Sequence, residues 1–171
     1  MAAEAGATYF DRKAGVEYVK RADGTWVPVQ AQRGAQWFEI KANAGYRISS
    51  EYPAKAVIAS GVVPAVAWPR ILEINAKYSA PREAGTGLPS KGSVAILAAV
   101  VDGVETKLGT TDQPPPWNNR IYGQVNAAFL LAAGKAATIR FEGALVGGSG
   151  QRFTWDGRIG SYVRVAALPL V

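Results

Sequence analysis

Hydrophobic and polar residues alternate along much of the chain with a period of two, which is the pattern of a β-strand with one buried and one exposed face. Residues 72–78 place Leu, Ile, Ala and Tyr on one face and Glu, Asn and Lys on the other, and residues 137–142 repeat the pattern. The alanine-rich residues 126–137 keep this period, which argues against a helix. The pattern predicts an all-β protein with eight or more strands from Val57 onward.

Turn residues separate the predicted strands. Residues 93–101 are followed by Asp102-Gly103, a dipeptide that accepts positive φ angles at both centres of a type I′ hairpin turn. We therefore expect a hairpin between this strand and residues 104–108. The sequence Ala133-Gly134-Lys135 predicts a second hairpin, between residues 121–131 and the alternating strand that follows.

Two of these strands are expected to be apolar on both faces, namely residues 93–101 and residues 121–131. One face would be covered by a second sheet, and the other must be covered by something else. A neighbouring subunit about a threefold axis is one way to cover it, so this pattern favours a homotrimer.

The first 52 residues differ from the rest of the chain. They hold five short strand-like pieces, which are Thr8–Phe10, Val16–Val19, Thr25–Val29, Trp37–Ile40 and Tyr46–Ile48. Pieces of this length bury too little surface to stand alone. We therefore expect residues 1–52 to form an arm of short hairpins that packs on the main body or on a partner, and residues 53–171 to form the main domain.

The composition is that of a globular protein with a core, because 49% of the 171 residues are hydrophobic and 19% are charged. Cysteine and histidine are absent, which excludes disulfides, thiolate nucleophiles, the usual zinc ligands and imidazole catalysis. The net charge of +6 is dispersed among acidic residues, so we expect no nucleic-acid partner. No apolar run has the length of a signal peptide or a membrane span, so we expect no membrane insertion.

No arrangement of residues predicts catalysis. Residues 85–92 resemble a phosphate-binding loop only in composition, because their lysine precedes Gly92 and is not part of a Gly-Lys-Ser/Thr sequence. The 13 acidic residues are scattered along the chain. We expect no catalytic residue, no cofactor and no metal site, although Asp102, Glu105 and Asp112 could hold a calcium ion together with loop carbonyls.

One loop carries a candidate contact site. It follows the prolines at 114–116 and contains Trp117, Asn118, Asn119, Arg120 and Tyr122. Flat aromatic faces beside amide groups can stack on a sugar ring or anchor a protein partner. The alternative is that Trp117 packs against the edge of the core under a rigid loop.

Two short motifs stand where predicted strands meet. Leu131-Ala-Ala-Gly134 leads into an alternating strand, and Gly160-Ser-Tyr-Val-Arg-Val165 opens the last strand. With the order of strands in residues 57–171, these motifs resemble the jelly roll of the tumour necrosis factor and complement-head superfamily in its bacterial and phage members. In the arm, residues 6–11 and 24–27 are similar to short segments of phage tail and fibre proteins.

This resemblance implies an antiparallel jelly-roll β-sandwich that assembles as a homotrimer and serves attachment or adhesion. We therefore expect a non-enzymatic virion protein of a tailed bacteriophage, either a head-decoration or head-fibre subunit or a short tail-fibre subunit, synthesised in the host cytoplasm. Its arm would bind capsid or tail subunits, and a host-surface glycan is a further candidate partner. The alternative is a carbohydrate-binding module or lectin-like adhesion domain that binds sugars through the loop at 117–122.

Overall fold

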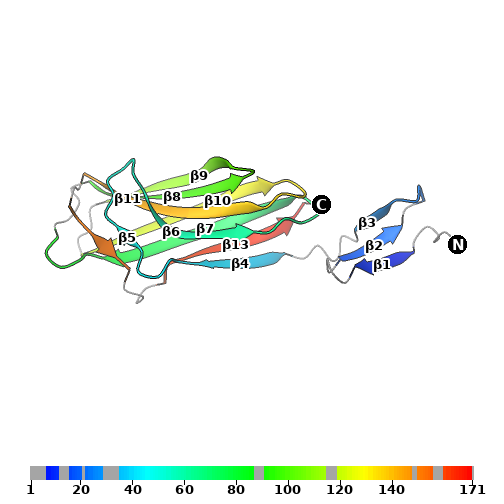
Figure 1. The fold of residues 1–171 in the computed structure, drawn as a ribbon, viewed down its shortest axis with the longest axis horizontal. Helices are drawn as coiled ribbons and strands as arrows, with labels where there is room; N and C mark the ends of the chain where they lie inside the picture. The colour runs from blue at the N-terminus through cyan, green and yellow to red at the C-terminus, as the bar shows by residue number, and fades with distance from the viewer. Residues whose placement is uncertain are drawn as a thin grey trace. The chain divides into compact units, whose positions relative to one another are not determined.

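The computed structural model describes residues 7–11, 16–20, 22–28, 35–86, 91–114, 119–147, 150–155 and 160–170. These residues form strands and turns (Figure 1), and none of them belongs to a helix that could cross a membrane. The chain separates into two compact units, residues 1–35 with residue 171, and residues 36–170.

The N-terminal unit is a three-stranded antiparallel sheet in the order β1-β2-β3. Its strands are β1 (Thr8–Asp11), β2 (Val16–Lys20) and β3 (Trp26–Pro28). Gly24 has a φ of 86° in the turn between β2 and β3, and the Thr25 amide donates a hydrogen bond of 2.9 Å to Asp23 Oδ1. The first three strand-like pieces of the sequence are therefore strands.

The second unit is a sandwich of two four-stranded antiparallel sheets (Figure 1). The first sheet has the order β10-β7-β13-β4 and consists of β4 (Gln36–Lys41), β7 (Arg70–Pro81), β10 (Arg120–Leu131) and β13 (Tyr162–Pro169). The second sheet has the order β6-β11-β8-β9 and consists of β6 (Ala56–Val63), β8 (Gly92–Val101), β9 (Val104–Gln113) and β11 (Ala137–Val146). A two-stranded sheet pairs β5 (Arg47–Ile48) with β12 (Phe153–Thr154). The prediction of eight or more strands beyond residue 56 is confirmed by β6 to β13.

One of the two predicted hairpins forms. Asp102 and Gly103 have φ angles of 51° and 80°, and they join the paired strands β8 and β9. The second predicted hairpin is wrong, because β10 pairs with β7 whereas β11 pairs with β6 and β8. Residues 132–136 therefore carry the chain from one sheet to the other. Alternation shows which face of a strand is buried, but strands that are consecutive in sequence do not always pair.

The inner faces of the two sheets form one continuous core. From β7 it contains Leu72, Ile74, Ala76 and Tyr78, the face that the alternation predicted to be buried, and each of these is at most 3% exposed. The Tyr78 ring lies 5.7 Å from the Phe141 ring of the opposite sheet, measured between centroids. Its hydroxyl donates to Ser93 Oγ at 3.2 Å, and burial raises the pKa of Tyr78.

Two elements expected in the arm belong to the sandwich. β4 pairs with β13 along its whole length and forms an edge of the first sheet. Its Ile40 packs against Gly61 of β6, and Ile48 of β5 is completely buried. The structure therefore divides the chain between residues 35 and 36, whereas the sequence placed the boundary between 52 and 53. Both strands are short in sequence, but their burial makes them part of the sandwich core.

The chain itself covers the outer face of β8. This face has a small buried cluster of Val94, Ile96 and Ala144, which are 3%, 4% and 0% exposed. Beside it, Leu145 of β11 donates a backbone hydrogen bond of 2.8 Å to Ser50 and accepts one of 2.9 Å from Tyr52. The apolar outer face of β8 therefore needs no neighbouring subunit. On β10 the outward positions include Gln124 and Asn126, so that strand is amphipathic and not apolar on both faces.

A buried carboxylate on β11 pairs with Lys55, which lies just before β6. Lys55 Nζ lies 2.6 Å from Glu142 Oε2, and Arg140 Nη2 lies 3.0 Å from Glu142 Oε1. The Glu142 side chain is only 2% exposed, so its charge depends on these two partners rather than on water.

We expect Lys55→Ala to lower the free energy of unfolding by about 1–3 kcal/mol, because Glu142 loses one of its two cations while it stays buried. Lys135→Ala is the matched control, since Lys135 and Asp102 form a pair of 2.6 Å whose side chains are 46% and 62% exposed. This control should cost less than about 1 kcal/mol in the same urea titration. Equal losses for the two variants would contradict the role given to Glu142.

Tyr78 fits between the sheets because Gly123 of β10 has no side chain. A Cβ at position 123 would lie 2.1 Å from Tyr78 Cε1 and 2.7 Å from Ala95 Cβ. We expect Gly123→Ala to lower the free energy of unfolding by about 1–3 kcal/mol, because the ring or the sheet spacing must shift. The exposed neighbour Gln124→Ala should change it by less than about 0.5 kcal/mol. Thermal or urea unfolding measures the stability of both variants. An unfolding midpoint of Gly123→Ala equal to that of the unmodified protein would count against this packing.

Candidate functional site

The predicted contact loop lies only partly within the described residues. Trp117 and Asn118 lie outside them, so their contacts stay a prediction. Asn119 has a φ of 58°, and its carbonyl accepts a hydrogen bond of 2.7 Å from the backbone amide that follows β7. Arg120 Nη1 donates to Ser79 Oγ at 3.0 Å, and Tyr122 is 38% exposed on the outer face of β10. Asn119 and Arg120 therefore help to join β10 to β7.

A carboxylate and a guanidinium group tie the loops together at the β5-β12 sheet. Arg47 Nε and Nη2 donate to the two oxygens of Glu83, each at 2.7 Å, and Thr154 Oγ1 also donates to Glu83. The hydrogen bonds from Arg47, followed by the one from Thr154, lower the pKa of Glu83 from 4.5 to about 2. This network connects β5 and β12 to the residues that follow β7, which is a structural role.

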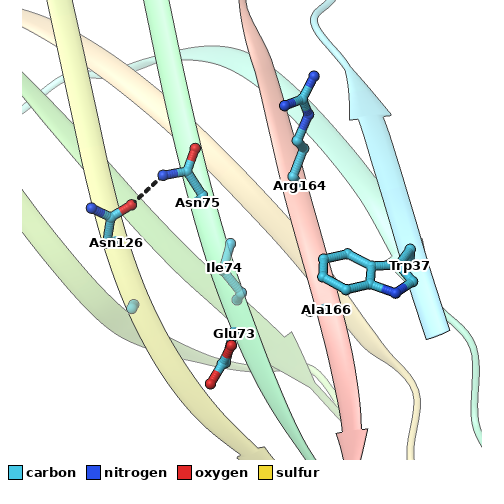
Figure 2. Close-up of a pocket in the computed structure, with 8 residues that line it drawn as sticks. Trp37, Glu73, Ile74, Asn75, Asn126, Arg164 and Ala166 are labelled. Carbon is cyan, nitrogen blue, oxygen red and sulfur yellow. Dashed lines mark hydrogen bonds between the residues drawn. The ribbon is translucent and has the colours of Figure 1, made fainter. Parts of the chain in front are cut away.

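A groove of about 670 Å³ lies on the outer face of the first sheet (Figure 2). Its lining comes from all four strands and consists of Trp37, Glu73, Ile74, Asn75, Asn126, Ala127, Arg164 and Ala166. The strand register arranges the outward side chains in two neighbouring rows, Glu73-Ala166-Trp37 and Asn126-Asn75-Arg164. Because adjacent strands lie about 4.8 Å apart, the distance from β4 to β10 across the groove is about 14 Å.

Trp37 forms one side of this groove. It is 77% exposed, although Phe38 and Ile40 on the same strand face the core. The indole extends from β4 toward β13, beside Ala166 (Figure 2). Ala166 is only 5% exposed, whereas the high exposure of Trp37 leaves a broad face of the indole open to solvent.

Amide and charged groups form the other side of the groove. Asn75 Nδ2 donates a hydrogen bond to Asn126 Oδ1 on the next strand (Figure 2). Arg164 Nε lies 3.5 Å from Glu39 Oε2, and its guanidinium carbon lies 4.3 Å from the centre of the Tyr162 ring. The lining thus offers an aromatic face, two amides and, in Glu73 and Arg164, one charge of each sign.

The sequence alone did not single out this groove. Trp37 was expected in a short piece of the arm. Glu73 and Asn75 were expected on the exposed face of residues 72–78, and Ile74 was expected on the buried face of the same strand. An exposed tryptophan at an outward position of an alternating strand was the available signal. Its neighbours could not be found in the same way, because β7, β10 and β13 are brought beside β4 only by the fold.

The acidic residues considered for calcium do not come together. Asp102 Oδ2 lies 2.6 Å from Lys135 Nζ at the β8-β9 turn, and Glu105 Oε2 lies 3.0 Å from Arg140 Nη1. Asp112 lies near the opposite end of β9. Among the residues that the structure describes, no group of three possible ligand side chains is placed to hold a metal ion.

The arrangement of sheets defines an antiparallel jelly-roll β-sandwich, as the sequence predicted. No family model matches the chain, and no curated protein is significantly similar to it. A mutant of the VP2 protein of infectious bursal disease virus, in particles with T=1 symmetry, is similar in structure over 99% of this chain, with a TM-score of 0.51 and 11% sequence identity. The chain spans 37% of the length of that protein.

Two carbohydrate-binding modules are more distantly similar. The C-terminal family 6 module of a laminarinase from Zobellia galactanivorans matches 77% of this chain and 99% of its own, at a TM-score of 0.36 and 12% identity. A family 35 module from an environmental isolate matches 99% of this chain and 90% of its own, at a TM-score of 0.31 and 15% identity. The likeness to VP2 shows the jelly-roll fold alone. None of the three named proteins places the chain in the tumour necrosis factor superfamily.

We expect the hydrogen bonds of Glu83 to make the free energy of unfolding depend on pH between about 2 and 4.5. A carboxylate whose pKa falls to about 2 on folding stabilises the folded state fully above its unfolded value of 4.5, and this contribution is lost as the pH falls toward 2. Glu83→Gln should therefore melt at a lower temperature than the unmodified protein at pH 7 but nearly together with it at pH 2. Glu73→Gln, outside the network, controls for loss of a charge. A melting difference for Glu83→Gln that stays the same at both pH values would contradict this assignment.

Proposed function

We propose that this chain is a non-enzymatic structural protein of a tailed-bacteriophage particle, a head-decoration, head-fibre or short tail-fibre subunit that attaches through its N-terminal unit. The observation that carries the proposal is an exposed aromatic face on β1, β2 and β3. The core of the sandwich includes no residue of the N-terminal sheet.

Three aromatic side chains gather on one face of the N-terminal sheet. Tyr9 and Tyr18 stand opposite each other on β1 and β2, with ring centroids 6.0 Å apart. Trp26 meets Tyr9 edge to face, also at 6.0 Å. Tyr9 is 53% exposed and Trp26 is 42% exposed. Aromatic residues of this kind commonly provide most of the binding energy at protein interfaces.

The N-terminal sheet is too small to bury this face by itself. Its three strands contain four, five and three residues. A sheet of this size has no room for a core of its own and gains stability when another surface packs on it. A capsid or tail protein that covers the aromatic face would provide both the missing packing and the attachment.

The assignment to a virus particle is supported by the fold. The VP2 protein, which is similar over 99% of this chain, belongs to a virus particle. The choice of a tailed phage is supported by the motif resemblance in residues 6–11, 24–27 and 131–165. A homotrimer and a location in the virion belong to the same proposal. The outer face of β8 does not support the trimer, because Val94 and Ile96 are already buried within the chain.

The carbohydrate-binding alternative receives no support from the loop at 117–122. Trp117 and Asn118 lie outside the described residues, and Arg120 is hydrogen-bonded to Ser79. The groove at Trp37 is a stronger place for such a contact.

We expect mass spectrometry to find this chain in purified particles of the phage that encodes it. A chain that carries Tyr9→Ser and Trp26→Ser should be incorporated at least tenfold less well in a complementation experiment, because it loses the aromatic face. Trp37→Ser is the matched control, since it removes an exposed tryptophan from the sandwich and should leave incorporation unchanged. Absence of the unmodified chain from the particles would overturn the proposal.

The same purified protein tests the oligomeric state. Light scattering at micromolar concentration should give three times the chain mass of 18.1 kDa. A mass of one chain would remove the homotrimer from the proposal and leave the attachment through the N-terminal unit to the incorporation experiment.

A further inference from the structure

We propose that the groove on the outer face of the first sheet binds a neutral saccharide, with a sugar ring stacked on Trp37 and its hydroxyls bonded to Asn75 and Asn126. This is a binding site in addition to the attachment face on the N-terminal unit, and the two use different residues.

The first argument is the position of Trp37. A flat indole that is 77% exposed presents an apolar surface with no partner among the residues that the structure describes. The face of a pyranose that carries axial C–H groups is flat and apolar, so it can stack on such a ring and exclude water from both. Two strand spacings, about 10 Å, separate β4 from β7, so a ring stacked on the exposed face of the indole lies on the side of the groove that faces β7.

The second argument is the hydrogen-bonding capacity of the opposite side. The bond between Asn75 and Asn126 uses one hydrogen of Asn75 and one lone pair of Asn126. The carbonyl oxygen of Asn75 and the amino group of Asn126 can therefore still accept and donate. A hydroxyl group both donates and accepts, so neighbouring hydroxyls of a sugar fit a pair of amides better than an ion or an apolar ligand does.

The third argument is charge. The lining contains one anion, Glu73, and one cation, Arg164. Arg164 already faces the carboxylate of Glu39 and the ring of Tyr162. The groove therefore has no excess of positive charge for a phosphate, a sulfated glycan or a nucleic acid, and Glu73 would repel an anion placed beside Trp37. A neutral ligand fits this balance.

The shape of the surface favours a small ligand over a protein partner. The apolar part consists of one exposed tryptophan ring with small contributions from Ile74, Ala127 and Ala166, and polar groups border it directly. Protein interfaces of specific complexes usually have a larger and continuous apolar centre. The volume of about 670 Å³ is in the usual range for small-molecule sites.

The test uses the purified full-length protein on an array of neutral oligosaccharides that contain glucose, galactose, mannose, xylose and N-acetylglucosamine. A sugar that binds on the array is then titrated by calorimetry. Trp37→Ala should weaken its binding at least tenfold, Trp37→Tyr should restore part of the affinity, and Asn126→Ala should weaken it about threefold to tenfold. Both side chains are on the surface, and melting temperatures confirm that the three variants are folded.

Trp26→Ala is the matched control, because it removes an exposed tryptophan from the N-terminal unit and should leave sugar binding unchanged. No binding to any neutral sugar, or binding that Trp37→Ala leaves intact, would overturn the proposal. Binding only to charged glycans, or a Trp37-dependent self-association seen by light scattering without sugar binding, would overturn it as well. These outcomes are independent of particle incorporation, which depends on Tyr9 and Trp26, so failure of one proposal is distinguishable from failure of the other.

Discussion

The close packing of two sheet faces is the interaction on which the rest of the structure depends. Tyr78 of the first sheet reaches the second sheet because Gly123 leaves room for its ring, and the ring then packs beside Phe141. Each strand must therefore direct one set of side chains inward, and the other set becomes available for different contacts. The two sheets differ in their outer faces: that of β8 is buried in part, and that of the first sheet forms a groove.

On the second sheet, the chain covers part of its own outer face. Ser50 and Tyr52 bond to the backbone of Leu145 on β11, and the buried Glu142 is neutralised by Lys55 and Arg140. On the first sheet, the outer face stays open and forms the groove beside Trp37. Among the described residues, the two sheets therefore differ in how much of their outer faces the sandwich itself buries.

The alternation of residues was sufficient to predict much of the fold. It identified the buried face of β7 and a minimum of eight strands from Val57 onward. The turn residues Asp102-Gly103 identified the β8-β9 hairpin. Both signals could be recognised because strand period and turn chemistry depend on neighbours in sequence. It failed at the second hairpin, since the pairing of β10 with β7 joins strands that are far apart in the chain. The sequence also placed β4 and β5 in the arm, because the length of a short strand does not show whether it pairs with a larger sheet.

The candidate site shows the same division. The sequence by itself determined that Glu73 and Asn75 lie on the polar side of their strand, since a period of two assigns faces locally. Only the tertiary structure decided that Trp37, Asn126 and Arg164 share one groove with them, because strand order is set by the burial of the opposite faces in a common core. For the same reason, the apolar outer face of β8 could be recognised in the sequence, while the segment that covers it could not.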